Sequence, residues 1–323
     1  MNREILIFVS FNIDMRYSEF VEVYEELSKK PGRLEKISIL SEFLKKIAKI
    51  GKSKWVYLLK GKVLADYKAG EFGISTRLTL KAIAHSYGAD VGEVSRRFNK
   101  MGDLGGLAEE FASKKKQSRL FSPRLSADKV FDNLLKVMEI VGKGAVEKKI
   151  FIISELLGSA SGKEAKYIVR TLMGDLKVGV ADSTIRDAIA EAFFPENKKE
   201  MSEIIGTAYG SANDFAVVLE EASRGEKGLS KIGVIPGRAM NVMLAVKADS
   251  IEEGFEICGK PAAIEQKYDG FRMVISKSGN EIKLFTRRLE DVTKQFPDVV
   301  SAVREYVSGE SFVLDSEVVG FDG

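Results

Sequence analysis

A long run of helix-type periodicity is the feature that most constrains how this chain can fold. From Met15 to about Arg224 the apolar residues recur mostly at spacings of three and four, as in Phe20, Tyr24 and Leu27. This spacing gathers apolar side chains along one face of an α-helix. Because glycine and proline interrupt the pattern at short intervals, we expect about ten or more ordinary helices joined by short loops.

The pattern changes after Arg224. Runs typical of β-strands follow at 262–268, 271–276 and 281–287, separated by Asp-Gly and Ser-Gly-Asn turns. A helix is expected at 298–307 and another strand at 311–320. The sequence therefore predicts a multidomain protein, with an all-α domain followed by an α+β domain.

The domain boundaries follow from these changes in pattern. We expect an N-terminal extension at 1–14, a helical domain at 15–228, a linker at 229–245 and the start of an α+β domain at 246–323. Residues 1–14 are interpreted either as an added strand or as the product of an upstream start codon.

The composition limits the possible partners and the cellular environment of the protein. The net charge is only +3, so any affinity for nucleic acid must come from how the charge is distributed. The single cysteine, Cys258, rules out an internal disulfide and fits a reducing, intracellular environment. No stretch approaches the ~20 apolar residues of a membrane span, so we expect no membrane partner.

Two glycine-bearing loops in the helical region carry basic residues. One contains Lys143 and Gly144 and is followed by Lys148, and the other runs from Arg170 to Gly179 and includes Lys177. A glycine loop that leads into a helix exposes backbone N–H groups where phosphate binds well. The loops are equally consistent with helix C-caps and solvated lysines, so both interpretations stay open.

A basic segment lies between the two halves of the helical region. It includes Gln117 and an apolar pair, Leu120 and Phe121, among lysine, arginine and serine residues. A solvated charge run is one interpretation. The other is a docking peptide that places the apolar pair in a partner's pocket while Gln117 forms a hydrogen bond nearby.

The chemistry is concentrated near the end of the sequence. Lys267 lies between apolar runs and is followed by Asp-Gly, which suggests an amine at the end of a strand before a hairpin turn. A neutral amine there would be a nucleophile, helped by desolvation and by a cation such as Arg272. The same residues are also consistent with an ordinary hairpin turn that has no chemical role.

Two further groups follow Lys267. Arg287 and Arg288 end a strand-like run and suit bidentate contact with phosphate. Asp315 and Glu317 lie two residues apart on a predicted strand, so both carboxylates share one face and could bind a ribose hydroxyl or a metal. Each group has a simpler interpretation as surface charge.

Taken in order, these residues resemble a known family. The segments Lys267-Tyr-Asp-Gly-Phe-Arg272, Phe285-Thr-Arg287 and Leu314-Asp-Ser-Glu317 are similar to motifs I, Ia and III of the nucleotidyltransferases. Within that superfamily the chain most resembles ATP-dependent DNA ligases of the archaeal and eukaryotic replicative type. The helical region, with Gly102-Asp-Leu-Gly105 and Glu164-Ala-Lys-Tyr167, resembles that family's DNA-binding domain.

The resemblance implies roles for individual residues. Lys267 would attack the α-phosphate of ATP and carry AMP, Glu265 would bind the adenine amino group, and Arg272 and Glu317 would contact the ribose and nearby groups. Arg287 would bind a phosphate of the nick, and Glu317 would serve as a ligand of Mg²⁺. The resemblance thus implies ATP and Mg²⁺ as cofactors and nicked duplex DNA as the partner.

It also implies a sliding clamp as a partner, because Gln117, Leu120 and Phe121 are similar to a shortened clamp-binding peptide. The DNA-backbone candidates remain Lys143, Gly144, Lys148, Arg170 and Lys177. We expect a monomer located in the cytoplasm of an archaeon or the nucleus of a eukaryote.

The sequence stops just after the motif III segment, so we expect an N-terminal part of a ligase that binds DNA but lacks the complete catalytic machinery. The alternatives are a non-catalytic DNA- and clamp-binding module and, within the superfamily, an RNA ligase or a capping guanylyltransferase. The size of the helical region argues against the last two.

Overall fold

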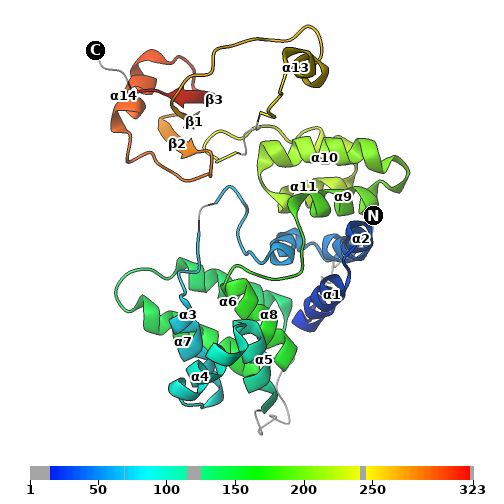
Figure 1. Ribbon diagram of the computed structural model, residues 1–323, viewed down its shortest axis with the longest axis vertical. Helices are drawn as coiled ribbons and strands as arrows, with labels where there is room; N and C mark the ends of the chain where they lie inside the picture. Colours follow the sequence, from blue (N-terminus) through cyan, green and yellow to red (C-terminus); the bar gives the residue numbers. More distant parts are fainter. Residues whose placement is uncertain (1–14, 69, 115–124, 241–244, 321–323) are drawn as a thin grey trace, which may run out of the picture. The chain divides into compact units, whose positions relative to one another are not determined.

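The computed structural model of this chain describes residues 15–68, 70–114, 125–240 and 245–320 (Figure 1). These residues form two compact units. The first takes in most of the chain up to Leu229, and the second begins at Ser230 and also takes in Asp66–Ala69 and Thr207–Asp214.

The first unit is built of helices. Their bounds are α1 Tyr17–Lys29, α2 Arg33–Ile50, the 3-10 helix η1 Ser53–Lys60, α3 Thr76–Tyr87, α4 Val91–Met101, α5 Leu104–Lys114, α6 Ala127–Glu139, α7 Ala145–Ser159, α8 Gly162–Leu172, α9 Asp182–Phe193, the 3-10 helix η2 Pro195–Asn197, α10 Lys198–Ala212, α11 Phe215–Arg224 and α12 Glu226–Leu229. The residues of α10 after Gly206 belong to the second unit.

Local sequence signals set where these helices begin and end. Ser161 accepts a hydrogen bond from the backbone of Glu164, whose carboxylate accepts one from the backbone of Ser161, so the two residues close a capping box at the start of α8. Gly102 ends α4 in the left-handed conformation, with φ of 72°. Such caps satisfy backbone groups that the helix itself leaves unpaired.

The core of the first unit contains several aromatic side chains. Phe20 of α1 lies edge-on to Phe43 of α2, with ring centroids 4.8 Å apart, and edge-on to Trp55 of η1 at 6.0 Å. The hydroxyl of Tyr24 is buried and donates to the carbonyl of Leu58 at 2.9 Å. Trp55 is 2% exposed and is the only tryptophan in the sequence, so its fluorescence reports on the folding of this unit.

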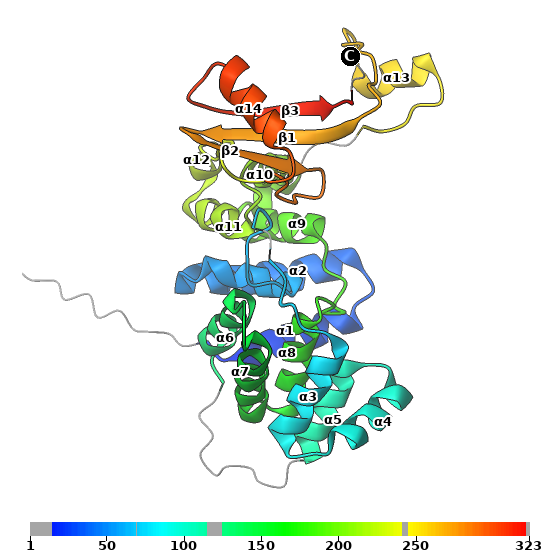
Figure 2. The same cartoon turned by 90° about the vertical axis from the view of Figure 1, so that its left-hand side faces the viewer.

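The second unit centres on an antiparallel sheet in the order β2-β1-β3 (Figure 2). Its elements are α13 Ile251–Cys258, β1 Phe271–Ser278, β2 Glu281–Thr286, α14 Pro297–Tyr306 and β3 Ser311–Val318. Ser278 and Glu281 pair across a two-residue hairpin loop, in which Gly279 adopts φ of 57°. This hairpin confirms the Ser-Gly-Asn turn expected from the sequence.

Both faces of this sheet are covered. On one face Met273 and Ile275 pack with Val303 of α14. Figure 2 shows α14 beside the sheet. On the other face Val274 and Phe285 pack with Ala239, which precedes the sheet in the chain. The same preceding segment is held to β1 by a hydrogen bond of 2.6 Å from the backbone of Gly237 to Ser276 Oγ.

The structure confirms the predicted fold class and corrects one element. The expected helix at 298–307 and strand at 311–320 correspond to α14 and β3. The expected strand at 262–268 is wrong: these residues are irregular and largely exposed. A strand forms only where a neighbouring strand takes up its backbone hydrogen bonds, and here β2 and β3 occupy both sides of β1.

None of the described helices is both long enough and apolar enough to cross a membrane.

Candidate functional site

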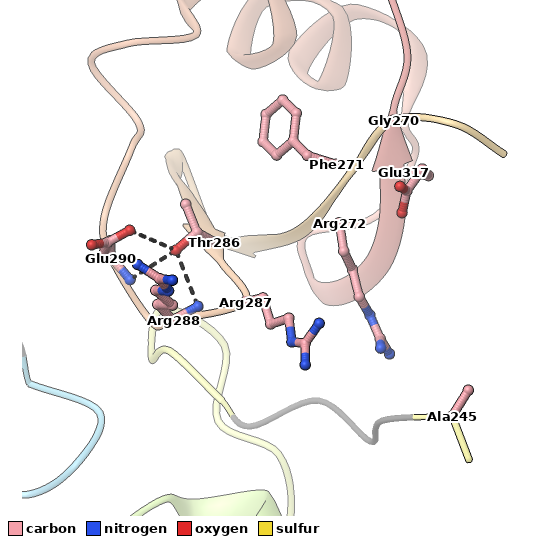
Figure 3. Close-up of a pocket in the computed structure, with 9 residues that line it drawn as sticks. All are labelled: Ala245, Gly270, Phe271, Arg272, Thr286, Arg287, Arg288, Glu290 and Glu317. Atoms are coloured by element: carbon pink, nitrogen blue, oxygen red, sulfur yellow. Dashed lines mark hydrogen bonds between the residues drawn. The ribbon is translucent and has the colours of Figure 1, made fainter. Parts of the chain in front are cut away.

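An arginine-rich cleft opens at one end of the sheet in the second unit (Figure 3). It has a volume of about 1060 Å³. The described residues that line it are Ala245, Gly270, Phe271, Arg272, Thr286, Arg287, Arg288, Glu290 and Glu317. In Figure 3 the side chains of Arg272 and Arg287 extend toward the same space. Guanidinium groups arranged in this way suit the oxygens of a phosphate.

Strand register places three of the sequence-predicted groups on one face of the sheet. Arg272 of β1 pairs with Glu317 of β3, and Val274 pairs with Asp315. Since residues two apart on a strand share a face, Asp315 and Glu317 lie together, as expected from the sequence, and the strand register adds Arg272 to them.

Within this group Arg272 is held by Asp315. Its Nε donates to Asp315 Oδ1 at 2.8 Å, and its Nη2 donates to Oδ2. This pair raises the pKa of Arg272 further, so the guanidinium is charged at every relevant pH. The sequence predicted a nucleotide or metal ligand at this carboxylate pair, whereas in the structure Asp315 fixes the arginine.

The turn after β2 positions the other arginines of the cleft. The hydroxyl of Thr286 accepts from the backbone N–H of Arg288 at 3.2 Å and from that of Glu290 at 3.3 Å, and it donates to Glu290 Oε2 at 3.2 Å (Figure 3). Leu289 closes the turn in the left-handed conformation, with φ of 65°. Sequence reasoning passed over Thr286 and Glu290, although their spacing of four residues around two arginines is a turn signal.

Lys267 and Glu265 lie apart from the cleft residues. Both are exposed in the irregular segment before β1, and neither is among the residues that line the cleft. Gly270 then brings the chain into the sheet so closely that a Cβ there would lie 2.2 Å from the carbonyl O of Val318. The Asp-Gly pair therefore serves as an entry bend into β1, and the expectation of a hairpin at this point is wrong.

The first glycine loop of the helical unit leads into α7. Gly144 is the N-cap of this helix, in the left-handed conformation with φ of 76°. Lys143 and Lys148 are exposed on either side of it, whereas Lys149 is buried and donates to the carbonyl of Phe72 at 2.6 Å. The loop thus presents two exposed lysines at a helix N-terminus.

The second loop joins α8 to α9. Arg170, expected in this loop, lies instead in the last turn of α8, and it shares one carboxylate with Lys177 of the loop. Arg170 Nη2 lies 3.0 Å from Asp103 Oδ2, and Lys177 Nζ lies 3.2 Å from Asp103 Oδ1. The sequence singled out both cations but assigned no role to Asp103, which is separated from them by 67 and 74 residues.

Comparison with known proteins assigns the chain to a family. A model described as "DNA ligase N terminus" matches residues 16–190, more than half of the chain, and one described as "ATP dependent DNA ligase domain" matches residues 242–323. The chain belongs to the ATP-dependent DNA ligase family. The first match covers most of the helical unit, and the second contains β1, β2 and β3.

Archaeal relatives agree with this assignment. A DNA ligase of Nanoarchaeum equitans is 38% identical over 309 residues, which are 95% of this chain and 53% of the relative. A DNA ligase of Thermococcus fumicolans is 36% identical over 306 residues, 94% of this chain and 54% of the relative. The chain therefore spans about half the length of these curated ligases.

Two further predictions from the ligase resemblance have no counterpart in the described residues. Gln117, Leu120 and Phe121, the predicted clamp-binding group, lie outside the described residues. Among the residues that are described, no group of three or more histidine, cysteine, aspartate or glutamate side chains is arranged to hold a metal ion. Glu317 as a ligand of Mg²⁺ therefore stays a prediction.

Proposed function

We propose that this chain carries DNA-binding and nucleotide-binding residues of a ligase that seals nicks in duplex DNA at the expense of ATP. The observation that carries the proposal is the order of the motifs. Lys267-Tyr-Asp-Gly precedes an arginine-rich cleft whose lining includes Arg272, Arg287 and Glu317, and this part of the chain follows a helical unit of the ligase type.

The residues of the cleft fit a nucleotide. Three guanidiniums, those of Arg272, Arg287 and Arg288, line a space large enough for a nucleotide-sized ligand. Arg272 would contact the ribose and nearby groups of the nucleotide, and Arg287 would bind a phosphate of the nick. Glu317 would accept a hydrogen bond from the ribose or coordinate Mg²⁺, and Glu265 would bind the adenine amino group.

Lys267 is the proposed nucleophile. Its neutral Nζ would form a bond to the α-phosphorus of ATP, the bond from that phosphorus to pyrophosphate would break, and the amine would lose a proton. Lys267 and Glu265 lie in the exposed, irregular segment that leads into Gly270 at the cleft. Mg²⁺, when bound, would stabilise charge on the phosphoryl oxygens.

The helical unit would hold the DNA. Lys143, Gly144, Lys148 and Lys177 are the proposed contacts with the phosphate backbone, which supply affinity independent of sequence. Arg170, a fifth candidate from the sequence, is only 14% exposed and pairs with Asp103, so its contribution to this surface is indirect. Gln117, Leu120 and Phe121 would bind a sliding clamp. We further propose that the protein is an intracellular monomer.

A second function deserves the same test, because one observation favours it. Lys267 lies exposed outside the cleft, and this is compatible with a chain that binds DNA and a clamp without carrying out adenylation. An RNA ligase or a capping guanylyltransferase is disfavoured by the match of the helical region to a DNA ligase model.

Incubation of the chain with ATP labelled at the α-phosphate, together with Mg²⁺, separates these functions. We expect labelled protein whose label survives alkali and is released by acid, as a phosphorus–nitrogen bond requires. Lys267→Ala should remove the label, whereas Lys260→Ala, which replaces an exposed lysine of the same region, should keep it. Equal labelling of the Lys267→Ala protein would refute the mechanism, and an unlabelled wild type that binds nicked DNA would favour the binding module.

A further inference from the structure

Asp103 occupies the junction of three segments in the helical unit. It follows the end of α4, and its Oδ2 accepts from the backbone N–H of Gly106 at 3.1 Å in the first turn of α5. The same carboxylate binds Arg170 at the end of α8 and Lys177 in the loop that follows. One side chain therefore ties the α4–α5 turn to the α8–α9 loop.

The packing around Asp103 leaves little freedom. A Cβ on Gly105 would lie 2.8 Å from Cγ of Arg170 and 3.0 Å from the carbonyl O of Lys166, so only glycine allows α5 to approach α8 this closely. Burial opposes the charge of Asp103, but hydrogen bonds from Arg170 and Lys177 outweigh it and lower the pKa of the carboxyl group. The carboxylate is therefore ionised at neutral pH.

The backbone conformation of the α8–α9 loop has to be stabilised by contacts such as the one with Asp103. Gly174, Lys177 and Gly179 all adopt positive φ angles, of 69°, 57° and 63°. For lysine this conformation is uncommon and costs free energy, and it persists only where the surroundings hold it. On the far side of the loop, Lys36 Nζ donates to the carbonyls of Val178 at 2.8 Å and Gly179 at 3.1 Å. The loop is thus fixed from both sides in one conformation.

The two cations that Asp103 binds differ in how far their side chains are exposed to solvent. The side chain of Arg170 is 14% exposed and lies over the ring of Tyr167, at 5.5 Å from its centroid. The side chain of Lys177 is 44% exposed. Asp103 offsets one of the two positive charges and Asp175 Oδ2 lies 3.9 Å from Lys177 Nζ, but an ammonium group has three donors. Lys177 can therefore reach a phosphate while it remains bound to Asp103, whereas Arg170 is enclosed.

We propose that Asp103 is a positioning residue for DNA binding: it holds the loop of Lys177 in the conformation that contacts a backbone phosphate, with Arg170 as a buried brace. This inference rests on the proposed function, because it presupposes that Lys177 faces DNA. It assigns the phosphate contact of this loop to Lys177 and gives Arg170 a structural part.

A double-mutant cycle on the full chain tests the proposal. Asp103→Asn keeps an acceptor for the helix cap but removes the charge that holds Lys177. Binding of a nicked duplex should weaken about 5-fold in Asp103→Asn and in Lys177→Gln, and the slope of log affinity against log salt should become shallower by about 0.9 in each. The double variant should bind within 2-fold of Lys177→Gln alone, because both changes remove the same contact.

Two controls isolate the role of Asp103. Asp90 caps the start of α4, where its Oδ1 accepts a hydrogen bond from the backbone N–H of Glu93 at 2.9 Å. Asp90→Asn alters this cap and should leave the affinity for nicked DNA unchanged. Asp175→Asn, which removes an exposed carboxylate 3.9 Å from Lys177, should not weaken binding, because it takes a negative charge away from the proposed phosphate contact. Trp55 fluorescence verifies folding. If Asp103→Asn is unstable, Asp103→Ser provides the same cap without charge.

The outcomes are distinguishable. Unchanged DNA affinity and salt slope in Lys177→Gln would overturn the proposed DNA surface on this loop and, with it, the inference. Weakened binding in Lys177→Gln, together with either an unaffected Asp103→Asn or losses that simply add in the double variant, would overturn the role of Asp103 and leave the DNA surface in place.

Discussion

The guanidinium of Arg272 and the carboxylate of Asp315 face each other diagonally across β1 and β3, with Nε 2.8 Å from Oδ1. The pair lies at the edge of the arginine-rich cleft and is partly exposed, at 30% and 50% of the two side chains. At such exposure an ion pair stabilises the fold by about 1 kcal/mol or less. Its main effect is to orient Arg272 and to lower the positive charge of the cleft.

Asp315→Asn should therefore strengthen anion binding. Asparagine still offers an oxygen to Arg272, while the negative charge that repels phosphate disappears. We expect inorganic pyrophosphate to bind about 2- to 5-fold more tightly, with little change in stability. Titration calorimetry measures the affinity for pyrophosphate. Arg272→Met, which removes a guanidinium from the cleft, should lower this affinity. Weaker binding to Asp315→Asn would mean that the charge itself is needed to hold Arg272.

The hydroxyl of Thr286 offers a second test of how the cleft is organised. Thr286→Val keeps the shape of the side chain but leaves the N–H groups of Arg288 and Glu290 without their acceptor, at a cost of about 1 kcal/mol or less because both groups are exposed and can bind water instead. Arg287 then loses its fixed position, and pyrophosphate affinity should fall about 3- to 10-fold. Thr286→Ser, which restores the hydroxyl, should recover most of the affinity. If both variants lost pyrophosphate affinity equally, the loss would be due to the packing of the Thr286 side chain and not to its hydroxyl.

Sequence patterns gave correct expectations wherever the determining contacts are local. The hairpin at Gly279-Asn280 and the helices of the first unit follow from turn residues and from spacings of three and four, which act within a few residues. The shared face of Asp315 and Glu317 followed from the two-residue period of a strand, whereas the place of Arg272 beside them depends on the register of β1 and β3, which neither segment reveals alone.

The expectations from the sequence failed where the structure of a segment depends on residues far away in the chain. The segment 262–268 has the composition of a strand, but strand formation requires a neighbour, and its own sequence does not reveal whether one is present. Asp103 drew attention only within a resemblance, because its partners are 67 and 74 residues away. A pattern confined to one segment cannot show that a carboxylate near α5 will neutralise cations near α8.

A third prediction concerns Glu25, which links α1 to α8. Its Oε1 accepts from Lys166 Nζ and from the hydroxyl of Tyr167, each at 2.8 Å, and Lys163 Nζ lies 3.2 Å from Oε2. Partial burial opposes ionisation, but the hydrogen bonds from these three groups outweigh it and lower the pKa of Glu25 to about 2. A carboxyl group with a lowered pKa in the folded state stabilises the fold above its unfolded pKa, and this stabilisation is lost as pH falls through the folded value.

Glu25→Gln should therefore reduce the free energy of unfolding by about 2 kcal/mol at pH 7, after a discount for solvent screening. The difference from wild type should shrink as pH falls from about 4.5 toward 2, because the wild-type carboxylate then takes up its proton. Urea unfolding followed by Trp55 fluorescence measures both quantities. Glu22→Gln, an exposed change on the same helix, should show neither effect. A difference that stays constant with pH would show that the side chain acts through its shape and hydrogen bonds rather than through its charge.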